Sequence, residues 1–462
     1  MLQNYGNLLR EARNQKNLSL KEVAEKTGIT DSRLSRMEKN SDSGIWKDLQ
    51  EFGELLHLYD LSPNFILSVL GYGDSSSLVA KVASLPDSDK EMVLGLISRL
   101  KPNNATEPRT VFRLGELFSG PGGLAWGAMH ARIADARYKV VHAWANDFDE
   151  ATCKTYASNI CPDNPDSVVC HDVRTLDLST LGPIDALAFG FPCNDFSIVG
   201  EKKGLSGTYG PLYTYGAQAL KIYKPLWFLA ENVGGLQSDN GGNTLKLILK
   251  DLSACGYRVY PHLYKFEEYG VPQMRHRIII IGIRNDLPYE YKVPSPESFA
   301  SVNVSCRNAI ENPPIPEDAF NNELTAQNEK VVERLKYIKP GQNAFNADIP
   351  EELQLKVKGA KISQIYKRLD PDRPAYTVTG SGGGGTHIYH WSEPRALTNR
   401  ERARLQTFPD EFKFEGKKEQ VRKQIGMAVP CKGAQIIVEA VLNTFAGIEY
   451  PSIPCNIELE GV

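Results

Sequence analysis

Apolar positions divide the chain into a helical beginning and a longer region where strands and helices alternate. From Leu8 to Leu56 they recur three and four positions apart, which is typical of short amphipathic helices. Beyond residue 110, short apolar runs bounded by glycine or proline predict strands. The clearest runs are Lys139–Ala143, Ile184–Phe189, Leu226–Ala230 and Arg277–Ile283. Their alternation with helical stretches predicts an α/β fold with a mostly parallel sheet.

The same pattern predicts the domain organisation. We expect an all-α helix-turn-helix domain over 1–72 and a polar linker over 73–110, in which Ser88–Leu100 has the pattern of one further helix. An α/β body is expected over 111–284 and 395–462. Between its two parts, over 285–394, periodicity weakens and proline and asparagine become frequent, which indicates a separate small lobe.

Composition narrows the class of protein. The 462 residues are 41% hydrophobic and carry a formal net charge of -3, an ordinary globular balance in which any nucleic-acid surface must be a local patch. The eight cysteines include no CxxC pair, so reduced thiols and no metal site are expected. The amino terminus lacks a long apolar run, which predicts no signal peptide, no membrane anchor and a cytoplasmic, nucleoid-associated protein.

The segment LKEVAEKTGITDSRLSRMEK has the spacing of a helix-turn-helix, with Gly28 where the turn needs a positive φ. It resembles the Cro/CI-type repressor family. We therefore expect Ser32, Arg33 and Arg36 to face a major groove. Further basic side chains are expected to meet phosphates: Arg10, Arg13, Lys16 and Lys39. The alternative is a helical hairpin that only packs or dimerises.

A glycine-rich turn, FSGPGG from Phe118, follows the first strand of the body and opens a helix. Such a turn lets the backbone approach a nucleoside cofactor, although the motif alone is a weak signal. At the end of the next strand, Asp147 is placed to bind ribose hydroxyls and Phe148 to stack on adenine. Asp172, after a third strand, is a candidate for the adenine amino group.

Three further blocks stand at strand ends. Cys193, in GFPCNDFS, follows a buried strand in a proline-bounded loop, which favours an exposed nucleophile over an inert core thiol. Glu231, in ENV, ends another apolar strand, and Arg275 and Arg277, in QMRHR, precede a further one. By themselves these groups are equally compatible with a structural glutamate–arginine pair at a sheet edge.

In order, the blocks FSGPGG, NDFD, GFPCNDFS, ENV, QMRHR, RALTNRERARLQTFPDEF and IGMAVP resemble the motifs of the DNA cytosine-5 methyltransferases over about residues 111–445. The resemblance implies a Rossmann-like, S-adenosylmethionine-dependent methyltransferase domain and a mixed α+β target-recognition lobe. It implies Cys193 as nucleophile, Glu231 as the residue that holds the flipped base, and Arg275 and Arg277 as its support. The implied cofactor residues are Phe118, Gly120, Gly122, Asp147, Phe148, Asp172, Pro192 and Met427. Met427 stands where the family usually has Asn.

The implied reaction transfers a methyl group from S-adenosylmethionine to carbon 5 of a cytosine flipped out of a specific double-stranded DNA site. The stretch Lys202–Gly216 is expected to close over the DNA. Within Arg368–Trp391, Thr379 and Ser381 are expected to approach base edges, the alternative being a glycine-rich hairpin without base contact. Two rival interpretations are an RNA cytosine-5 methyltransferase and a helix-turn-helix regulator with a vestigial methyltransferase body. Expected further partners are promoter DNA, bound by the helix-turn-helix, and a separate cognate restriction endonuclease.

Overall fold

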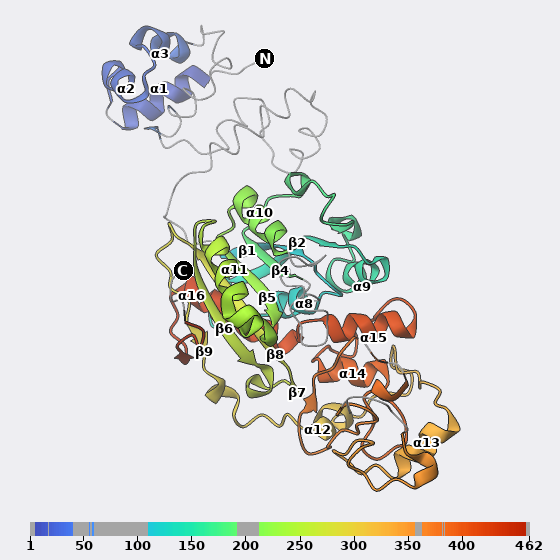
Figure 1. Ribbon diagram of the computed structural model, residues 1–462. Coiled ribbons are helices and arrows are strands. Elements are labelled where there is room, and N and C mark those ends of the chain that lie inside the picture. Colours follow the sequence, from blue (N-terminus) through green and yellow to red (C-terminus); the bar gives the residue numbers. More distant parts are fainter. Residues whose placement is uncertain are drawn as a thin grey trace. The chain divides into compact units, whose positions relative to one another are not determined.

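The structure is a computed structural model (Figure 1) that describes residues 5–16, 18–39, 55, 58–59, 110–191, 212–355, 363–380, 382 and 384–458. The chain divides into two compact units, Met1–Glu107 and Pro108–Val462.

The described part of the first unit contains three short helices, α1 (Tyr5–Gln15), α2 (Leu20–Thr27) and α3 (Asp31–Glu38). Ser19 caps α2 through a capping box with Glu22, and α2 ends at Gly28, whose φ of 74° confirms the predicted left-handed turn. The apolar side chains that the periodicity selected are buried: Leu9, Val23, Ile29, Leu34 and Met37. The predicted helix-turn-helix is therefore present as α2 and α3.

The second unit is built on a seven-stranded sheet in the order β3-β2-β1-β4-β5-β8-β6. Its strands are β1 (Val111–Leu117), β2 (Lys139–Asp147), β3 (Val168–Cys170), β4 (Ala186–Gly190), β5 (Trp227–Val233), β6 (Tyr257–Lys265) and β8 (His276–Arg284). The first five strands of that order run parallel, whereas β8 is antiparallel to both β5 and β6. The mostly parallel sheet is confirmed, and β6 is a strand that the sequence pattern missed.

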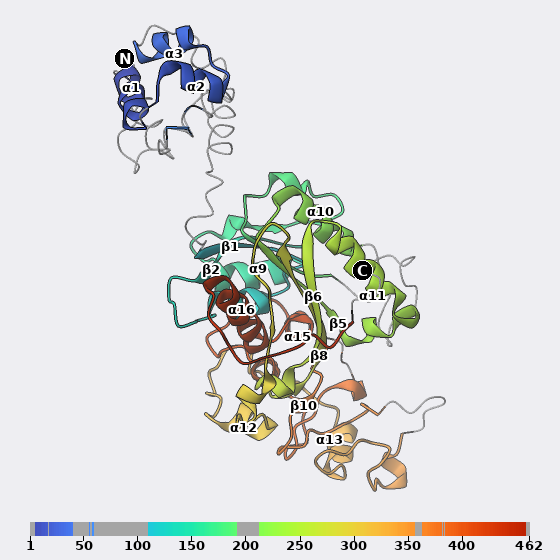
Figure 2. The same ribbon diagram turned by 90° about the vertical axis from the view of Figure 1, so that its left-hand side faces the viewer.

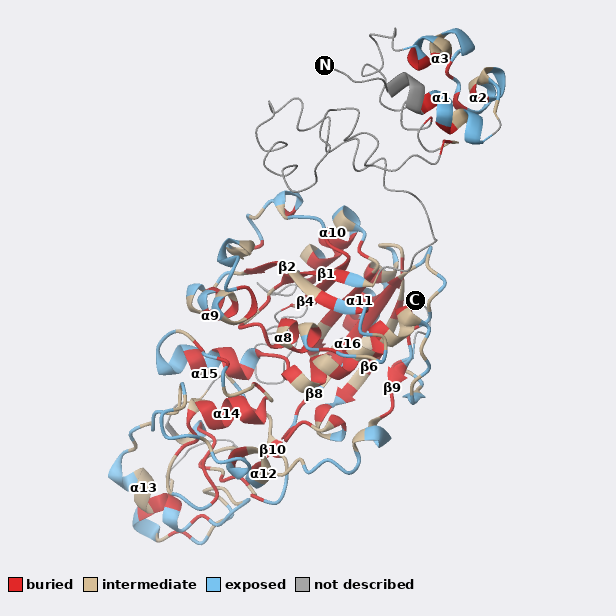
Figure 3. Cartoon of the chain, turned by 180° about the vertical axis from the view of Figure 1, so that it is seen from behind, coloured by how far each residue is buried: buried red, intermediate tan, exposed pale blue. Residues whose placement is uncertain are grey.

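Helices cover both faces of this sheet. One apolar cluster joins β1 to α8 (Gly123–Met129), α9 (Glu150–Ile160) and α16 (Cys431–Ala446). A second cluster on the opposite face joins β4 and β5 to α10 (Tyr213–Tyr223) and α11 (Asn243–Ser253). Figure 2 shows α16 and α11 on different sides of the strands, and Figure 3 shows the strands between them as largely buried. The carboxyl-terminal α16 thus completes a layer begun about three hundred residues earlier by α8.

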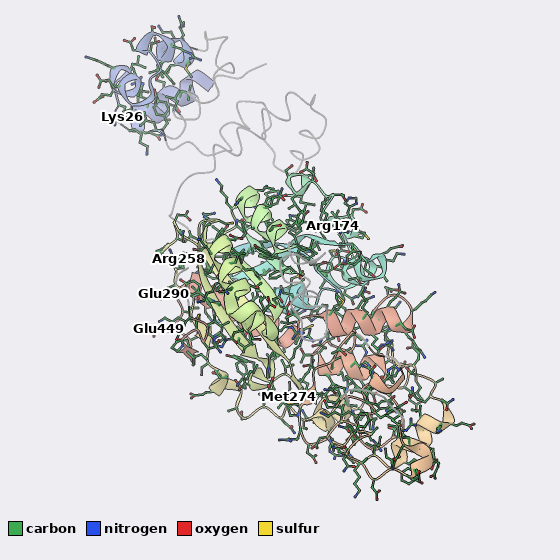
Figure 4. All side chains as sticks on the ribbon, in the orientation of Figure 1. Lys26, Arg174, Arg258, Met274, Glu290 and Glu449 are labelled. Carbon is green, nitrogen blue, oxygen red and sulfur yellow. The ribbon has the colours of Figure 1, made fainter. Side chains whose placement is uncertain are left out.

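The predicted lobe contains little regular structure: β9 (Val293–Pro294), α12 (Cys306–Glu311), α13 (Glu329–Lys336) and β10 (Ala375–Tyr376). It is joined to the body by α14 (Asn399–Leu405) and α15 (Lys418–Met427), and by β10, which pairs in parallel with β7 (Gln273–Met274). Met274 lies where sheet and lobe meet (Figure 4). The buried Gln273 side chain accepts a hydrogen bond from Val378 N at 2.7 Å and donates one to Gln406 Oε1 at 2.9 Å. These bonds fix the segment after β10 against the sheet.

Among the described helices, one stretch, Lys418–Ala446, is long and apolar enough to cross a membrane. It combines α15 with α16, and 78% of its most apolar window is buried inside the protein. A core helix passes the same test of length and composition.

Candidate functional site

A cavity of 740 Å³ opens at the carboxyl ends of the parallel strands. Ligands of open α/β sheets bind at this edge, and the volume lies within the range of small-molecule sites. The predicted site residues that line the cavity are Phe118, Gly120, Asp147, Phe148, Asp172, Glu231, Arg275, Arg277, Thr379 and Met427. Tertiary folding therefore brings both candidate groups, the cofactor residues and the base-holding residues, to one place.

The glycine-rich turn forms one wall of the cavity. Gly120 donates its backbone N–H to Asp147 Oδ2 at 3.0 Å, and the N–H of Asp149 reaches Oδ1 at the same distance. Phe118 holds a φ of 55°, a conformation that is strained for a residue with a side chain and that persists only where surrounding contacts enforce it. Burial raises the pKa of Asp147, and the two N–H donors oppose that shift. The turn and the acidic residue are thus locked to each other.

Gly122 does not line the cavity among the described residues. It begins α8 at a φ of 98°, and a Cβ there would stand 2.8 Å from Ile160 Cγ1. The glycine is required for the turn and for close packing on α9 rather than for direct approach to a ligand.

Phe148, which is predicted to stack on adenine, has an exposed side chain that suits this role. The Phe148 ring is 66% exposed although it lines the cavity, and Lys423 Nζ lies 5.9 Å from its centroid. Lys423 also lies 3.8 Å from Asp149 Oδ2. Asp172 is held by paired bonds from Arg174, which lower its pKa to about 2 and keep it ionised. An exposed aromatic face beside an acceptor suits an aminopurine.

Glu231 and Arg277 form the polar centre of the opposite wall. Arg277 Nε lies 2.8 Å from Glu231 Oε1, and the side chains are 13% and 12% exposed. Gly190 stands beside Glu231 in the β4–β5 register, and a Cβ at Gly190 would be 3.2 Å from Oε2. The missing side chain keeps this carboxylate accessible from the end of β4.

Arg275 has a different environment from Arg277. It is 1% exposed and donates from Nη1 to the carbonyl oxygen of Val378 at 3.2 Å. The next residues of that segment, Thr379 and Gly380, line the cavity. Arg275 therefore fixes the segment that faces Glu231, whereas Arg277 carries the ion pair with Glu231.

Glu116 is a cavity residue that the sequence analysis did not select as a site residue. It is 3% exposed and accepts a hydrogen bond from the Tyr156 hydroxyl at 3.1 Å. Burial raises the pKa of Glu116 to about 8, so the carboxyl group is protonated at neutral pH. Lys423 and Asn232 were also missed as lining residues, because their motifs carried no signal for the direction of each side chain.

Some predicted site residues lie outside the described part of the chain: Pro192, Cys193, Ser381, the stretch 202–211 and the linker 73–109. In the first unit, Ser32 and Arg36 are exposed on α3 and Arg33 is partly exposed, as a groove-facing surface requires. Arg13 differs from its predicted phosphate role. Its guanidinium bonds Glu38 at 2.6 and 3.0 Å and Leu18 O at 2.8 Å, so it serves the packing of α1 on α3.

Met427, at the end of α15, is 59% exposed and lines the cavity. The adjacent Gly426 packs so closely on the segment after β10 that a Cβ would come 1.9 Å from Gly380 N. The Met427 thioether therefore lies at the exposed side of the cavity. The end of α15 that carries it is held in place by the close backbone packing of Gly426 on Gly380. A flexible apolar chain can cover a ligand there but cannot donate a hydrogen bond as Asn can.

Comparison with known proteins agrees with this geometry. The family model for C-5 cytosine-specific DNA methylases matches residues 112–443, and a helix-turn-helix model matches residues 9–65. The type II methyltransferase M.BbvI of Brevibacillus brevis is 60% identical over 76% of this chain and 96% of its own. M.Sau96I of Staphylococcus aureus, also a type II methyltransferase, is 30% identical over 95% of this chain and 98% of its own.

Among solved structures, a putative DNA modification methyltransferase encoded within an Escherichia coli prophage matches with a TM-score of 0.55. It is 24% identical and covers 72% of this chain and 99% of that protein, which supports the fold. The fold is that of a methyltransferase, and the matched family implies the use of S-adenosylmethionine. The chain belongs to the C-5 cytosine-specific DNA methylases and carries an amino-terminal helix-turn-helix. These matches do not favour either rival interpretation, an RNA cytosine-5 methyltransferase or a helix-turn-helix regulator with a vestigial methyltransferase body.

Proposed function

We propose that the 740 Å³ cavity is the catalytic site at which Cys193 attacks a flipped cytosine of double-stranded DNA. The observation that carries this proposal is the β4–β5 register, which sets Gly190 beside Glu231. Cys193 follows Gly190 by three residues, a span of at most ~10 Å of extended chain. A connection this short supports a role for Cys193 beside the carboxylate that the family uses to hold the base.

The cavity also fits S-adenosylmethionine. Phe148 offers an exposed ring for adenine, Asp147 offers carboxylate lone pairs beyond those taken by Gly120 and Asp149, and Asp172 remains ionised. Phe118, Gly120 and Met427 complete the wall around these groups. When bound, S-adenosylmethionine supplies an electrophilic methyl group on a sulfonium centre.

Within that site the residues of the chain have separate tasks. The Cys193 thiolate adds to C6 of cytosine, which makes C5 nucleophilic. Glu231, held by Arg277, accepts a hydrogen bond from the exocyclic amine and, in its protonated form, donates one to N3, and so stabilises charge that develops in the ring. After C5 is methylated, loss of the C5 proton to a base or water expels Cys193. Arg275 acts as a positioning residue, because it fixes the carbonyl of Val378 beside the base.

A duplex that carries 5-fluorocytosine at the target tests this mechanism. Fluorine cannot leave as a proton does, so the bond between Cys193 and C6 persists and a denaturation-resistant protein–DNA adduct accumulates. We expect the adduct with the wild-type chain, with mass spectrometry placing it on the peptide that contains Cys193. An adduct on another residue, or methyl transfer by Cys193→Ser, would overturn the assignment. Methylation sequencing of DNA from expressing cells supplies the target site.

We further propose that the helix-turn-helix binds the promoter of its own gene through Ser32, Arg33 and Arg36 and represses it. Exposure of Ser32 and Arg36 on α3 supports this role. Deletion of residues 1–75 is expected to abolish promoter binding in a gel-shift assay and to raise expression from a promoter reporter. Unchanged repression by the truncated chain would contradict it.

The type II relatives suggest that this enzyme protects cytoplasmic DNA from a separate cognate restriction endonuclease. Host DNA methylated by the chain should resist cleavage by that nuclease at the methylated sequence. Thr379 lines the cavity and is proposed, with Ser381, to approach bases around the target. Substitution of either by Ala should alter the flanking sequence preference in a methylation assay on a random-site library.

A further inference from the structure

A second polar site lies beside the segment that follows β10, distinct from the residues assigned above. Arg402 on α14 is 2% exposed and His387, at the end of that segment, is 7% exposed. Arg422 reaches toward them from α15. Arg402 Nη2, Arg422 Nε and His387 Nδ1 are buried and have no hydrogen-bond partner among the described residues. Three such atoms in one place are unusual for a folded protein.

The three side chains are close enough to affect one another electrostatically. Burial, and then the charge of Arg422, lower the pKa of Arg402 to about 10, so its guanidinium remains charged at neutral pH. Burial and the same two arginines lower the pKa of His387 to about 4, so the imidazole is neutral. The cluster therefore carries two positive charges and one neutral ring.

No carboxylate of the described chain neutralises these arginines. Glu401, the neighbour of Arg402 along α14, is taken by two bonds of 2.8 Å from Arg395 and by the backbone N–H of Thr398. Glu419 is exposed. An uncompensated buried guanidinium is strongly unfavourable, which indicates that an anion completes the cluster.

The chemistry of the cluster specifies the kind of anion. Guanidinium groups donate and cannot accept hydrogen bonds, and two of them carry more positive charge than the neutral acceptor edge of a guanine could offset. They match the oxygens of a phosphate.

The position of the cluster specifies the source of the phosphate. Thr377, Val378, Thr379 and Gly380 line the cavity that contains Glu231, and the chain continues from them to Gly382 and His387. Under the proposed function the flipped cytosine enters this cavity, so the strand that carries it passes close to a segment that lines the cavity. We propose that Arg402, Arg422 and His387 bind a backbone phosphodiester of the strand that carries the target cytosine. The inference rests on the proposed function of the cavity.

Salt dependence of DNA binding tests the site in the full-length chain. Arg422 is half-buried, so Arg422→Gln changes the charge at little risk to the fold. Each phosphate contact contributes about 0.9 to the slope of log affinity against log salt concentration. We expect Arg422→Gln to reduce that slope by about 1 and to raise the Kd about tenfold, with Arg422→Lys intermediate. Lys336→Gln is the matched control, because Lys336 is exposed and paired with Glu333; its slope should equal that of the wild type.

Single methylphosphonate linkages placed on either side of the target cytosine make the test position-specific. One linkage should cost the wild type about tenfold in Kd and cost Arg422→Gln nothing further. Equal losses for both proteins at every linkage would overturn the proposal. Wild-type chain that fails to methylate DNA would instead overturn the proposed function, which separates the two failures.

Inorganic phosphate, titrated into the DNA-free protein, distinguishes a free ion from the DNA backbone. A rise in Tm that Arg402→Gln abolishes, together with unchanged salt slopes for DNA, would show a free phosphate site only and overturn the assignment to DNA. Thermal unfolding and S-adenosylmethionine binding of Arg402→Gln establish that the variant is folded.

Discussion

Each unit of the molecule contains an arginine with little exposed surface, Arg13 in the first and Arg402 in the second, and their surroundings differ. In the first unit, Arg13 of α1 is bonded through both Nε and Nη2 to Glu38 of α3. In the second unit, Arg402 is more deeply buried, has Arg422 as its charged neighbour, and has no carboxylate bonded to it among the described residues. The fold supplies a carboxylate partner for Arg13. The described residues supply none for Arg402, for which we propose a DNA phosphate.

The difference shows that the partners of an arginine side chain, and not its place in a motif, indicate whether it is available to bind a DNA phosphate. Arg13 looked like a phosphate contact because it is basic and lies close to a helix-turn-helix. Arg402 looked like one of several arginines in a helical motif. The partners of each guanidinium reverse these expectations, because an arginine already paired with a buried carboxylate has little charge left to offer DNA.

The largest expected effect is that of Cys193→Ser, which should abolish methyl transfer by the second unit and leave DNA binding by the first unit intact. Cys193→Ser should lower the rate of methyl transfer by at least ~10³-fold, since a serine hydroxyl is a far weaker nucleophile near neutral pH. Promoter binding by the helix-turn-helix should remain, as measured by gel shift. A variant that loses both functions would break the separation.

Removal of the partner of Arg13 tests the structural side of the comparison. Glu38→Gln should destabilise the first unit by about 2 kcal/mol, because the buried Glu38 carboxylate provides the charge-assisted hydrogen bonds to the partly buried Arg13 guanidinium. Chemical denaturation followed by circular dichroism measures the change. Glu22→Gln is the control: Glu22 is exposed, and Gln also completes a capping box, so little change is expected. Equal effects of the two substitutions would contradict the structural role of Glu38.

Glu116 tests whether burial at the cavity costs stability at high pH. Its folded pKa of about 8 lies above the unfolded value, so the protonated form stabilises the fold at low pH and this contribution falls as pH rises toward 8. Between pH 6 and pH 8 the wild type should lose about 2 kcal/mol from this group. Glu116→Gln should flatten the stability profile over that window, as measured by denaturant unfolding. An unchanged profile would show that Glu116 is ionised in the folded state.

The smallest expected effect lies on α3. Arg36→Gln should weaken promoter binding by about 1 kcal/mol and leave the steady-state rate of methyl transfer unchanged on a short duplex without the promoter. Fluorescence anisotropy and a radiolabelled methyl-transfer assay measure the two. A fall in transfer rate would show that the first unit contributes to catalysis, which the comparison does not expect.

The sequence by itself determined the type of chemistry and the family. A thiol, a carboxylate and two arginines at predicted strand ends are local features, and strand ends of a parallel sheet converge by geometry. The left-handed turn at Gly28 is equally local, since the spacing of apolar residues and one glycine specify it.

Only the tertiary structure decided which partners meet. It pairs Glu231 with Arg277 and directs Arg275 to Val378, although both arginines stand in one pentapeptide. It places Gly122 against Ile160, joins Arg13 to Glu38, and gathers Arg402, Arg422 and His387 from three segments. Each of these contacts joins residues separated by more than a turn or a strand, so its geometry depends on packing across the whole unit. Spacing along the chain records which residue types are present, and packing determines whether their charges are satisfied.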